Sequence, residues 1–290
     1  MKRPKFAVLT DSASDIPPEL AEKQGVDILS LKINVDGKSY VERDDFTFEE
    51  FYEILRTCQK VPTTSQVTMF EFLEQFEKYE KEKVEEVLYV SINSTGSATH
   101  DAAVLASQNF QEKHPGSGMK IWIVDSHTYS MSYGYFVTEA AAKLRSGAEM
   151  RDVVEWLNDV FSRAEIILGA YTLKFLKKSG RVNAAAAFAG ELLGLRPIIS
   201  LTNGISAVES KVRGDAAVMP ALIEYADKRM DDTKQYMVAG ADKKQIEELA
   251  ALCRKKWKAE PLVSFWVGAA VAVNTGPDVS AVVFLGEKRV

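Results

Sequence analysis

The stretch VLYVSINSTGSAT, residues 87–99, decides the fold of this chain. Its first four residues form a short apolar run typical of a buried strand, and polar residues and a helical pattern follow. The same order recurs in FAVLTDSASD (residues 6–15) and IWIVDSHTYS (residues 121–130). Strands that alternate with helices predict an α/β fold with a mostly parallel sheet.

The region between the first two of these strands predicts further elements of the same lobe. We expect a strand over residues 27–35, a turn at residues 36–37 and an amphipathic helix after Thr47. Thr68 and Glu71 have the spacing of a capping box, which predicts a second helix start. Thr64 therefore lies just before a helix.

The second half of the chain predicts a mixed α/β lobe. A helix after residue 147 leads to an apolar strand at residues 166–170, and we place the domain boundary near this point. We expect an N-terminal lobe at residues 1–162 and a C-terminal lobe at residues 163–290. The elements expected beyond the boundary are a turn at 177–181, an alanine-rich helix at 184–193, a hairpin of 197–201 and 205–210, a long helix, a strand near 235–239, another helix, and a terminal pair at 262–273 and 279–285.

Composition excludes several classes of protein. The formal charge of -5 is spread over mixed Lys and Glu runs, so no basic surface for nucleic acid or anionic membrane is expected. Two cysteines, Cys58 and Cys253, fit free thiols in a reducing compartment. Neither a signal peptide nor a transmembrane segment is expected, which indicates the cytoplasm.

The three segments that follow the strands are rich in hydroxyl side chains. Five lie within residues 91–99, and four lie at alternate positions of residues 126–132. Ligands of open parallel sheets bind at the carboxyl ends of the strands, and a hydroxyl donates a hydrogen bond without adding a charge. The pattern suits an anion that is held and not attacked, although helix capping alone also explains Ser and Thr at these positions.

An ordered set of motifs resembles the DegV family of fatty-acid-binding proteins over essentially the full length of the chain. Those of the first half are TDSASDIP (10–17), PTTSQ (62–66), residues 92–103, and VDS (124–126) followed by SYG (132–134). Those of the second half are LKKSGRV (176–182), LRPII (195–199) and KVRG (211–214).

The resemblance implies a DegV-like two-lobed protein with a lipid tunnel between the lobes. The carboxylate of one long-chain fatty acid would be held by Thr64 and Ser97, and the helix at residues 184–193 is a candidate tunnel wall. Ser65, Gly96, Asn274 and Thr275 are expected near the head group. The protein would present the carboxylate to a separate fatty acid kinase in phospholipid metabolism, with no catalytic residue, metal or cofactor of its own.

Two positions that are expected to affect the transfer to a kinase depart from the family pattern. Asn274 stands where the family commonly has histidine, and Asp278 stands where glycine is usual. In the family, that histidine and an arginine matched here by Arg213 are associated with the kinase partner. Asparagine can form hydrogen bonds, but it has no titratable proton and cannot become positively charged. The departure therefore affects the expected coupling to a kinase more than the expected lipid binding. Ala98 and His100 also differ from the usual residues of the second loop.

Three other functions remain open from the residues. A serine hydrolase would use Ser97, Asp125 and His127, but the chain lacks the Gly-x-Ser-x-Gly elbow. A metal-dependent phosphotransferase would use Asp11 with Asp125, but no phosphate-binding glycine loop accompanies them. A binder of another long-chain amphiphile is the third, and the acyl chain length and saturation stay open with it.

Overall fold

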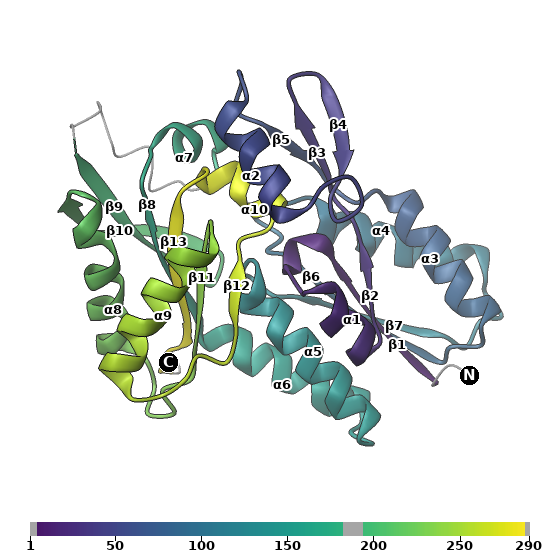
Figure 1. Cartoon of the computed structure of the whole chain (residues 1–290). Helices are drawn as coiled ribbons and strands as arrows, with labels where there is room; N and C mark the ends of the chain where they lie inside the picture. The colour runs from purple at the N-terminus through teal and green to yellow at the C-terminus, as the bar shows by residue number, and fades with distance from the viewer. Residues whose placement is uncertain (1–4, 182–193, 288–290) are drawn as a thin grey trace. The chain divides into compact units, whose positions relative to one another are not determined.

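The computed structural model describes residues 5–181 and 194–287, which divide into two compact units (Figure 1). Unit 1 comprises residues 1–32 and 65–161, and unit 2 comprises residues 33–64 and 162–290. Each unit is a layered α/β structure built on its own main sheet. The α/β class expected from the sequence is confirmed.

Unit 1 is built on a parallel sheet of four strands in the order β2-β1-β6-β7. The register places Val8 beside Leu88, and Leu88 beside Trp122. Nearly every residue of β1 and β6 is buried, which explains why both strands are continuous apolar runs. The three expected parallel strands are therefore confirmed. The strands are β1 (Phe6–Asp11), β2 (Val26–Leu29), β6 (Glu86–Ser91) and β7 (Lys120–Asp125).

The helices of unit 1 lie between these strands in the chain or follow the last of them, and the helix start predicted at Thr68 is confirmed. Thr68 caps α3 (Met69–Lys81), since its side chain accepts from the Glu71 amide while the Glu71 carboxylate accepts from the Thr68 amide. Helix α1 (Pro18–Gln24) packs beside α5 (Met131–Arg145), and α3 packs beside α4 (Thr99–Lys113). These helices are α1 (Pro18–Gln24), α3 (Met69–Lys81), α4 (Thr99–Lys113), α5 (Met131–Arg145) and α6 (Met150–Arg163).

The strand order contains a topological switch point between β1 and β6. From β1 the chain crosses through α1 to β2 on one side, whereas from β6 it crosses through α4 to β7 on the other. Right-handed crossovers in opposite directions put α1 and α4 on opposite faces of the sheet. The loops that follow β1 and β6 diverge at this point, which is where open α/β sheets bind ligands.

Unit 2 holds a mixed sheet of six strands in the order β10-β9-β8-β13-β11-β12 and a small sheet in the order β4-β3-β5. The pairing of β9 with β10 is antiparallel, which confirms the expected hairpin. The strands are β3 (Lys32–Val35), β4 (Lys38–Val41), β5 (Thr63–Ser65), β8 (Ala164–Ala170), β9 (Leu195–Thr202), β10 (Ile205–Arg213), β11 (Tyr236–Gly240), β12 (Ser264–Trp266) and β13 (Val279–Leu285). The helices are α2 (Phe48–Thr57), α7 (Lys174–Ser179), α8 (Val218–Arg229), α9 (Lys243–Trp257) and α10 (Ala269–Thr275).

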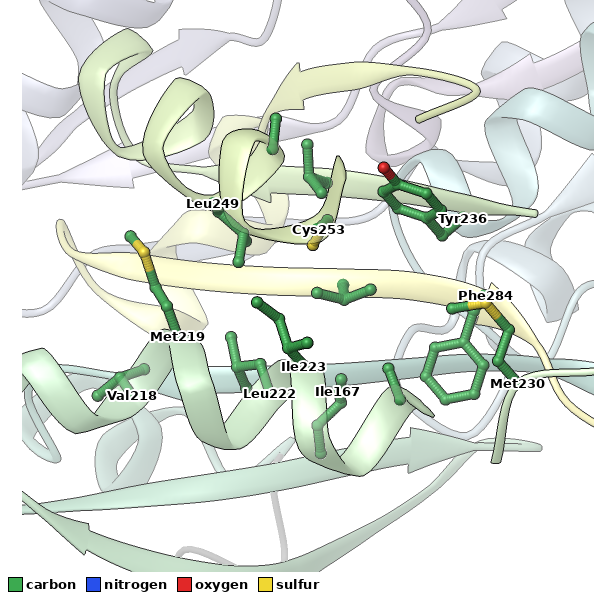
Figure 2. Close-up of a cluster of buried hydrophobic side chains, with 14 of the residues drawn as sticks. Ile167, Val218, Met219, Leu222, Ile223, Met230, Tyr236, Leu249, Cys253 and Phe284 are labelled. Carbon is green, nitrogen blue, oxygen red and sulfur yellow. The ribbon is translucent and has the colours of Figure 1, made fainter. Parts of the chain in front are cut away.

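A buried cluster joins the helices of unit 2 to its large sheet (Figure 2). Leu222 and Ile223 of α8 and Leu249 of α9 pack with Val282 and Phe284 of β13. Burying a side chain of this size contributes about 1.5–3 kcal/mol of hydrophobic free energy. This cluster holds the helices on the sheet.

Residues 33–64 group with unit 2, whereas the N-terminal lobe expected at residues 1–162 includes them. Long-range contacts explain the difference. The Tyr52 hydroxyl donates to the Val267 carbonyl at 2.9 Å, and the Glu42 carboxylate accepts from the Ala270 amide at 2.8 Å. Phe48 also stacks on Trp266 with ring centroids 6.0 Å apart.

Other local expectations are corrected in detail. The strand expected over residues 27–35 is two strands, β2 and β3, because the Leu31 amide between them bonds to the Ser12 hydroxyl instead of a neighbouring strand. The turn expected at residues 177–181 is the end of α7, stopped by Gly180 at φ 69. Residues 262–273 form β12 and the start of α10. The alanine-rich helix at 184–193 lies outside the described residues.

Candidate functional site

The candidate site of unit 1 is the loop at residues 92–98, between β6 and α4 at the switch point. Ser97 is its central residue in the predictions from sequence. The Ser97 hydroxyl lies 2.9 Å from the Thr99 hydroxyl and accepts from the Thr99 amide at 3.3 Å. Ala98 is the N-cap residue of α4 and has no polar side-chain atom that could accept a hydrogen bond. The Ser97 hydroxyl therefore satisfies one of the amides at this helix start.

The same geometry leaves Ser97 able to hold an anion. Thr99 is fully buried, whereas Ser97 is only half-buried. When the Thr99 hydroxyl donates to Ser97, the Ser97 oxygen accepts two bonds and its own proton is available to an outside acceptor. Capping and anion binding are therefore compatible at this residue.

Asn93 holds the loop in shape. Its carbonyl oxygen accepts from the amides of Gly96 and Ser97, both at 3.1 Å. Its side-chain oxygen accepts from the Thr95 amide at 3.2 Å, and its side-chain nitrogen donates to the Tyr129 hydroxyl at 2.7 Å. Asn93 is fully buried, so the loop is fixed from inside. The sequence did not single out Asn93 or Tyr129, because both look like ordinary turn residues.

Gly96 is required by the close approach of Tyr129. A Cβ atom at this position would overlap the Tyr129 hydroxyl and lie 3.1 Å from a carbon of its ring. Tyr129 comes from the loop after β7, so the two loops pack directly on one another. The glycine of the second loop thus has a steric role.

Asp11 and Asp125 orient the loops, as their positions at the ends of β1 and β7 suggest. Asp125 accepts from the Ser94 amide at 3.2 Å and the His127 amide at 2.9 Å. Asp11 is fully buried and accepts from the Ile92 amide at 3.0 Å. Desolvation raises the pKa of Asp11, while its hydrogen bonds with Ile92 and the hydroxyls of two tyrosines act in the opposite direction.

The hydrolase arrangement is not supported by this geometry. His127 contacts Asp125 at 3.1 Å, but in the described part of the chain the Ser97 hydroxyl contacts Thr99 and not His127. A nucleophile needs its base within hydrogen-bond reach. Within residues 5–181 and 194–287, no three His, Cys, Asp or Glu side chains are grouped so that they could share a metal ion.

Thr64 lies in β5 and is half-buried, with the exposed Ser65 after it. The strand ends three residues before Thr68, which caps α3. Thr64 belongs to unit 2, and Ser65, Gly96 and Ser97 belong to unit 1. The shared carboxylate contact of Thr64 and Ser97 therefore stays a prediction.

The remaining candidates lie in unit 2. Asn274 is in the last turn of α10, and its side-chain nitrogen donates to the Ala270 carbonyl at 2.9 Å. Thr275 follows it, is buried, and its hydroxyl has no hydrogen-bond partner among the described residues. Arg213 ends β10 and Asp278 precedes β13, and both are exposed.

The fold and loops of unit 1 define an α/β protein with a hydroxyl-rich switch point and no catalytic arrangement of Ser97, Asp125 and His127. The family model described as "Uncharacterised protein, DegV family" matches residues 5–287. A DegV domain-containing protein of Clostridium perfringens is 33% identical over 93% of this chain and 94% of its own length. The chain belongs to the DegV family.

Solved structures of similar proteins agree with the fold over nearly the whole chain. A DegV lipid binding protein from Thermotoga maritima superimposes with a TM-score of 0.84 at 27% identity, covering 99% of this chain and 100% of that one. A DegV family protein from Thermus thermophilus, described by its fatty acid binding, gives 0.79 at 28% identity, covering 97% and 99%. The helices of the described residues all lack either the length or the apolar character that crossing a bilayer requires.

Proposed function

We propose that this chain binds one long-chain fatty acid and holds its carboxylate with the hydroxyls of Thr64 and Ser97. The observation that carries the proposal is the Ser97 hydroxyl, half-buried at the switch point and able to donate while Thr99 satisfies its acceptor sites. The relatives from Thermotoga maritima and Thermus thermophilus, described as lipid and fatty acid binding, support the class of ligand.

Apolar burial dominates the affinity in this proposal. A chain of about fifteen methylenes contributes roughly 0.8 kcal/mol each, or ~12 kcal/mol before the costs of association and ordering. A carboxylate buried without partners would cancel part of this gain. Hydroxyls, backbone amides near Gly96, and the neighbours Ser65, Asn274 and Thr275 make the head-group end tolerable. The head group therefore sets the orientation of the lipid more than its affinity.

The proposed protein is a cytoplasmic carrier that performs no chemistry alone and uses no metal or cofactor. It presents the carboxylate to a separate fatty acid kinase, with Arg213 at the contact. The exposure of Arg213 suits that role. Asn274 bonds to its own helix and cannot carry charge, so the transfer step is where this chain differs most from the family pattern.

Lipid extraction tests the binding proposal. Purified protein is extracted with organic solvent, and mass spectrometry is expected to identify a long-chain fatty acid. Recovery of an amphiphile without a carboxylate would show that the chain binds another class of long-chain ligand. Recovery of no amphiphile, together with no binding of added fatty acid, would refute the proposal.

Substitutions test the two hydroxyls. Ser97→Ala and Thr64→Val are each expected to weaken fatty acid binding by about 1–3 kcal/mol, because a buried carboxylate oxygen loses its donor. Ser146→Ala is the matched control, since the exposed Ser146 hydroxyl donates to the Lys143 carbonyl at the end of its own helix. Wild-type affinity in both site variants would remove the head-group assignment.

The kinase step has its own test. Asn274→His is expected to leave lipid affinity unchanged and to raise acyl phosphate formation when a competent fatty acid kinase is supplied. The same rate with either residue would mean that Asn274 does not limit the transfer.

A further inference from the structure

Asp11 is a buried carboxylate that the proposed function leaves unused. It ends β1, has no solvent exposure, and accepts hydrogen bonds from uncharged protein groups, three of which come from segments distant in the sequence. Its Oδ1 accepts from the Tyr133 hydroxyl at 2.7 Å. Its Oδ2 accepts from the Ile92 amide at 3.0 Å and the Tyr89 hydroxyl at 3.1 Å.

Such a carboxylate is a poor choice for stability alone. Removing a charge from water costs free energy that neutral donors offset only in part, and a well-packed apolar residue in its place is often as stable or more stable. Desolvation is the largest influence on the pKa of Asp11 and raises it. A residue that carries this cost at a strand end needs another explanation.

The three donors come from the elements that surround the candidate site. Tyr89 and Ile92 belong to β6 and the start of its loop, and Tyr133 belongs to the first turn of α5. Asp11 thus ties β1 to its neighbour across the switch point and to the helix that follows the third hydroxyl-rich loop.

A short chain of bonds runs from Asp11 to Ser97. Asp11 fixes the Ile92 amide, and Ile92 is followed by Asn93, whose carbonyl accepts from the Ser97 amide at 3.1 Å. Both Ile92 and Asn93 are buried, so this path is shielded from water. A loss of the bond at Ile92 would release the beginning of the loop that carries Ser97.

We propose that Asp11 is a positioning residue that sets the Ser97 hydroxyl through Ile92 and Asn93 for the carboxylate of the ligand, an inference that rests on the proposed function. Asp11 touches no ligand in this account. Its effect is therefore specific to the head group and absent for the acyl chain.

Two probes with the same chain separate this role from a general structural one. Palmitate carries the carboxylate, and hexadecanol carries an alcohol in its place. Equilibrium affinities are measured with radiolabelled ligand for the wild type, Asp11→Asn and Asp11→Leu. Asparagine keeps one acceptor for Ile92 and loses the charge, whereas leucine keeps neither.

The expected order of palmitate affinity is wild type, then Asp11→Asn lower by about 2–5-fold, then Asp11→Leu lower by about 5–50-fold, as expected for a lost buried hydrogen bond. Hexadecanol affinity is expected to change less than twofold. Tyr133→Phe is the matched control, because it removes a donor to Asp11 but leaves the Ile92 bond in place. Should Asp11→Leu fail to fold, Asp11→Asn decides the question.

A double variant tests whether Asp11 acts through Ser97. In a Ser97→Ala protein, Asp11→Asn is expected to cause no further loss of palmitate affinity, because the free-energy effects of coupled residues are not additive. Unchanged palmitate affinity in Asp11→Asn, equal losses for both probes, or additive losses in the double variant would overturn the inference while the proposed function stands. A wild type that binds neither probe would overturn both.

Discussion

The hydroxyl of Tyr129 occupies the space that a Cβ atom on Gly96 would need. The two residues come from the loops after β7 and β6, and the same hydroxyl accepts a hydrogen bond from the Asn93 side chain at 2.7 Å. The close approach fixes one loop against the other one residue before Ser97. Glycine is the residue that permits this contact.

Gly96→Ala is therefore expected to lower the free energy of unfolding by about 1–3 kcal/mol, because the added methyl group forces Tyr129 or the loop to move. The measurement is urea unfolding followed by circular dichroism. Adding Tyr129→Phe to this variant is expected to recover part of the loss, since it removes the overlapping oxygen. Gly118→Ala is the control, because no atom of the described residues lies within 4 Å of its new methyl group. Additive effects of the two substitutions would contradict the steric account.

Local patterns predicted the framework of unit 1 because its strands and helix starts depend on short, continuous stretches of sequence. The apolar runs at residues 6–9 and 87–90 are strands β1 and β6, and Thr68 caps α3 through Glu71. These features depend on neighbours within a few residues.

Long-range contacts explain what local patterns could not predict. Residues 33–64 group with unit 2 partly through Tyr52 and Val267, which are 215 positions apart. Three partners of Asp11 lie 78 to 122 positions away, so the sequence around Asp11 predicted only an aspartate that orients a loop. Thr64 and Ser97 were identified from family motifs, since hydroxyl density alone indicates capping equally well.

Asp11→Asn is expected to become more stable relative to wild type as pH rises. The buried carboxyl has a pKa above its ordinary value of 3.8, so the unfolded chain loses this proton first and binds fewer protons than the native state. Wild-type stability from this group therefore falls as pH rises from 3.8 to the raised pKa. Asparagine removes the effect. Urea unfolding from about pH 4 to about pH 7 measures it.

Asp36 provides a control of opposite sign. Its carboxylate accepts from the amides of Gln59 and Lys60 at 2.9 and 3.0 Å, and these bonds hold its pKa below the ordinary value. This stabilisation is present above pH 3.8 and is lost as pH falls through the native pKa. Asp36→Asn should therefore lose stability relative to wild type as pH rises. The same pH trend in both variants would contradict the assignment.

Arg229→Ala is expected to lower the free energy of unfolding by about 3–5 kcal/mol. Its guanidinium makes two bonds, at 2.7 and 2.6 Å, to the carboxylate of Glu165, whose side chain is 1% exposed. Removing the arginine leaves a buried charge without its cation. Removing both charges with Glu165→Leu and Arg229→Leu together should cost less than Arg229→Ala alone. Lys228→Ala is the control at an exposed ion pair, with an expected change below about 0.5 kcal/mol.

Cys58 is expected to react with iodoacetamide at least about 100-fold faster than Cys253 in the native protein, because the reactive species is the thiolate. Cys253 is a residue of α9 and is fully buried in the hydrophobic cluster of unit 2 (Figure 2). Burial raises the pKa of its thiol to about 12. Cys58 is only half-buried, although burial raises its pKa as well. Peptide mass spectrometry over a time course measures both rates. Cys58→Ser should abolish fast labelling until urea unfolds the chain, and equal rates at the two cysteines would show that the core of unit 2 opens before the reagent reacts.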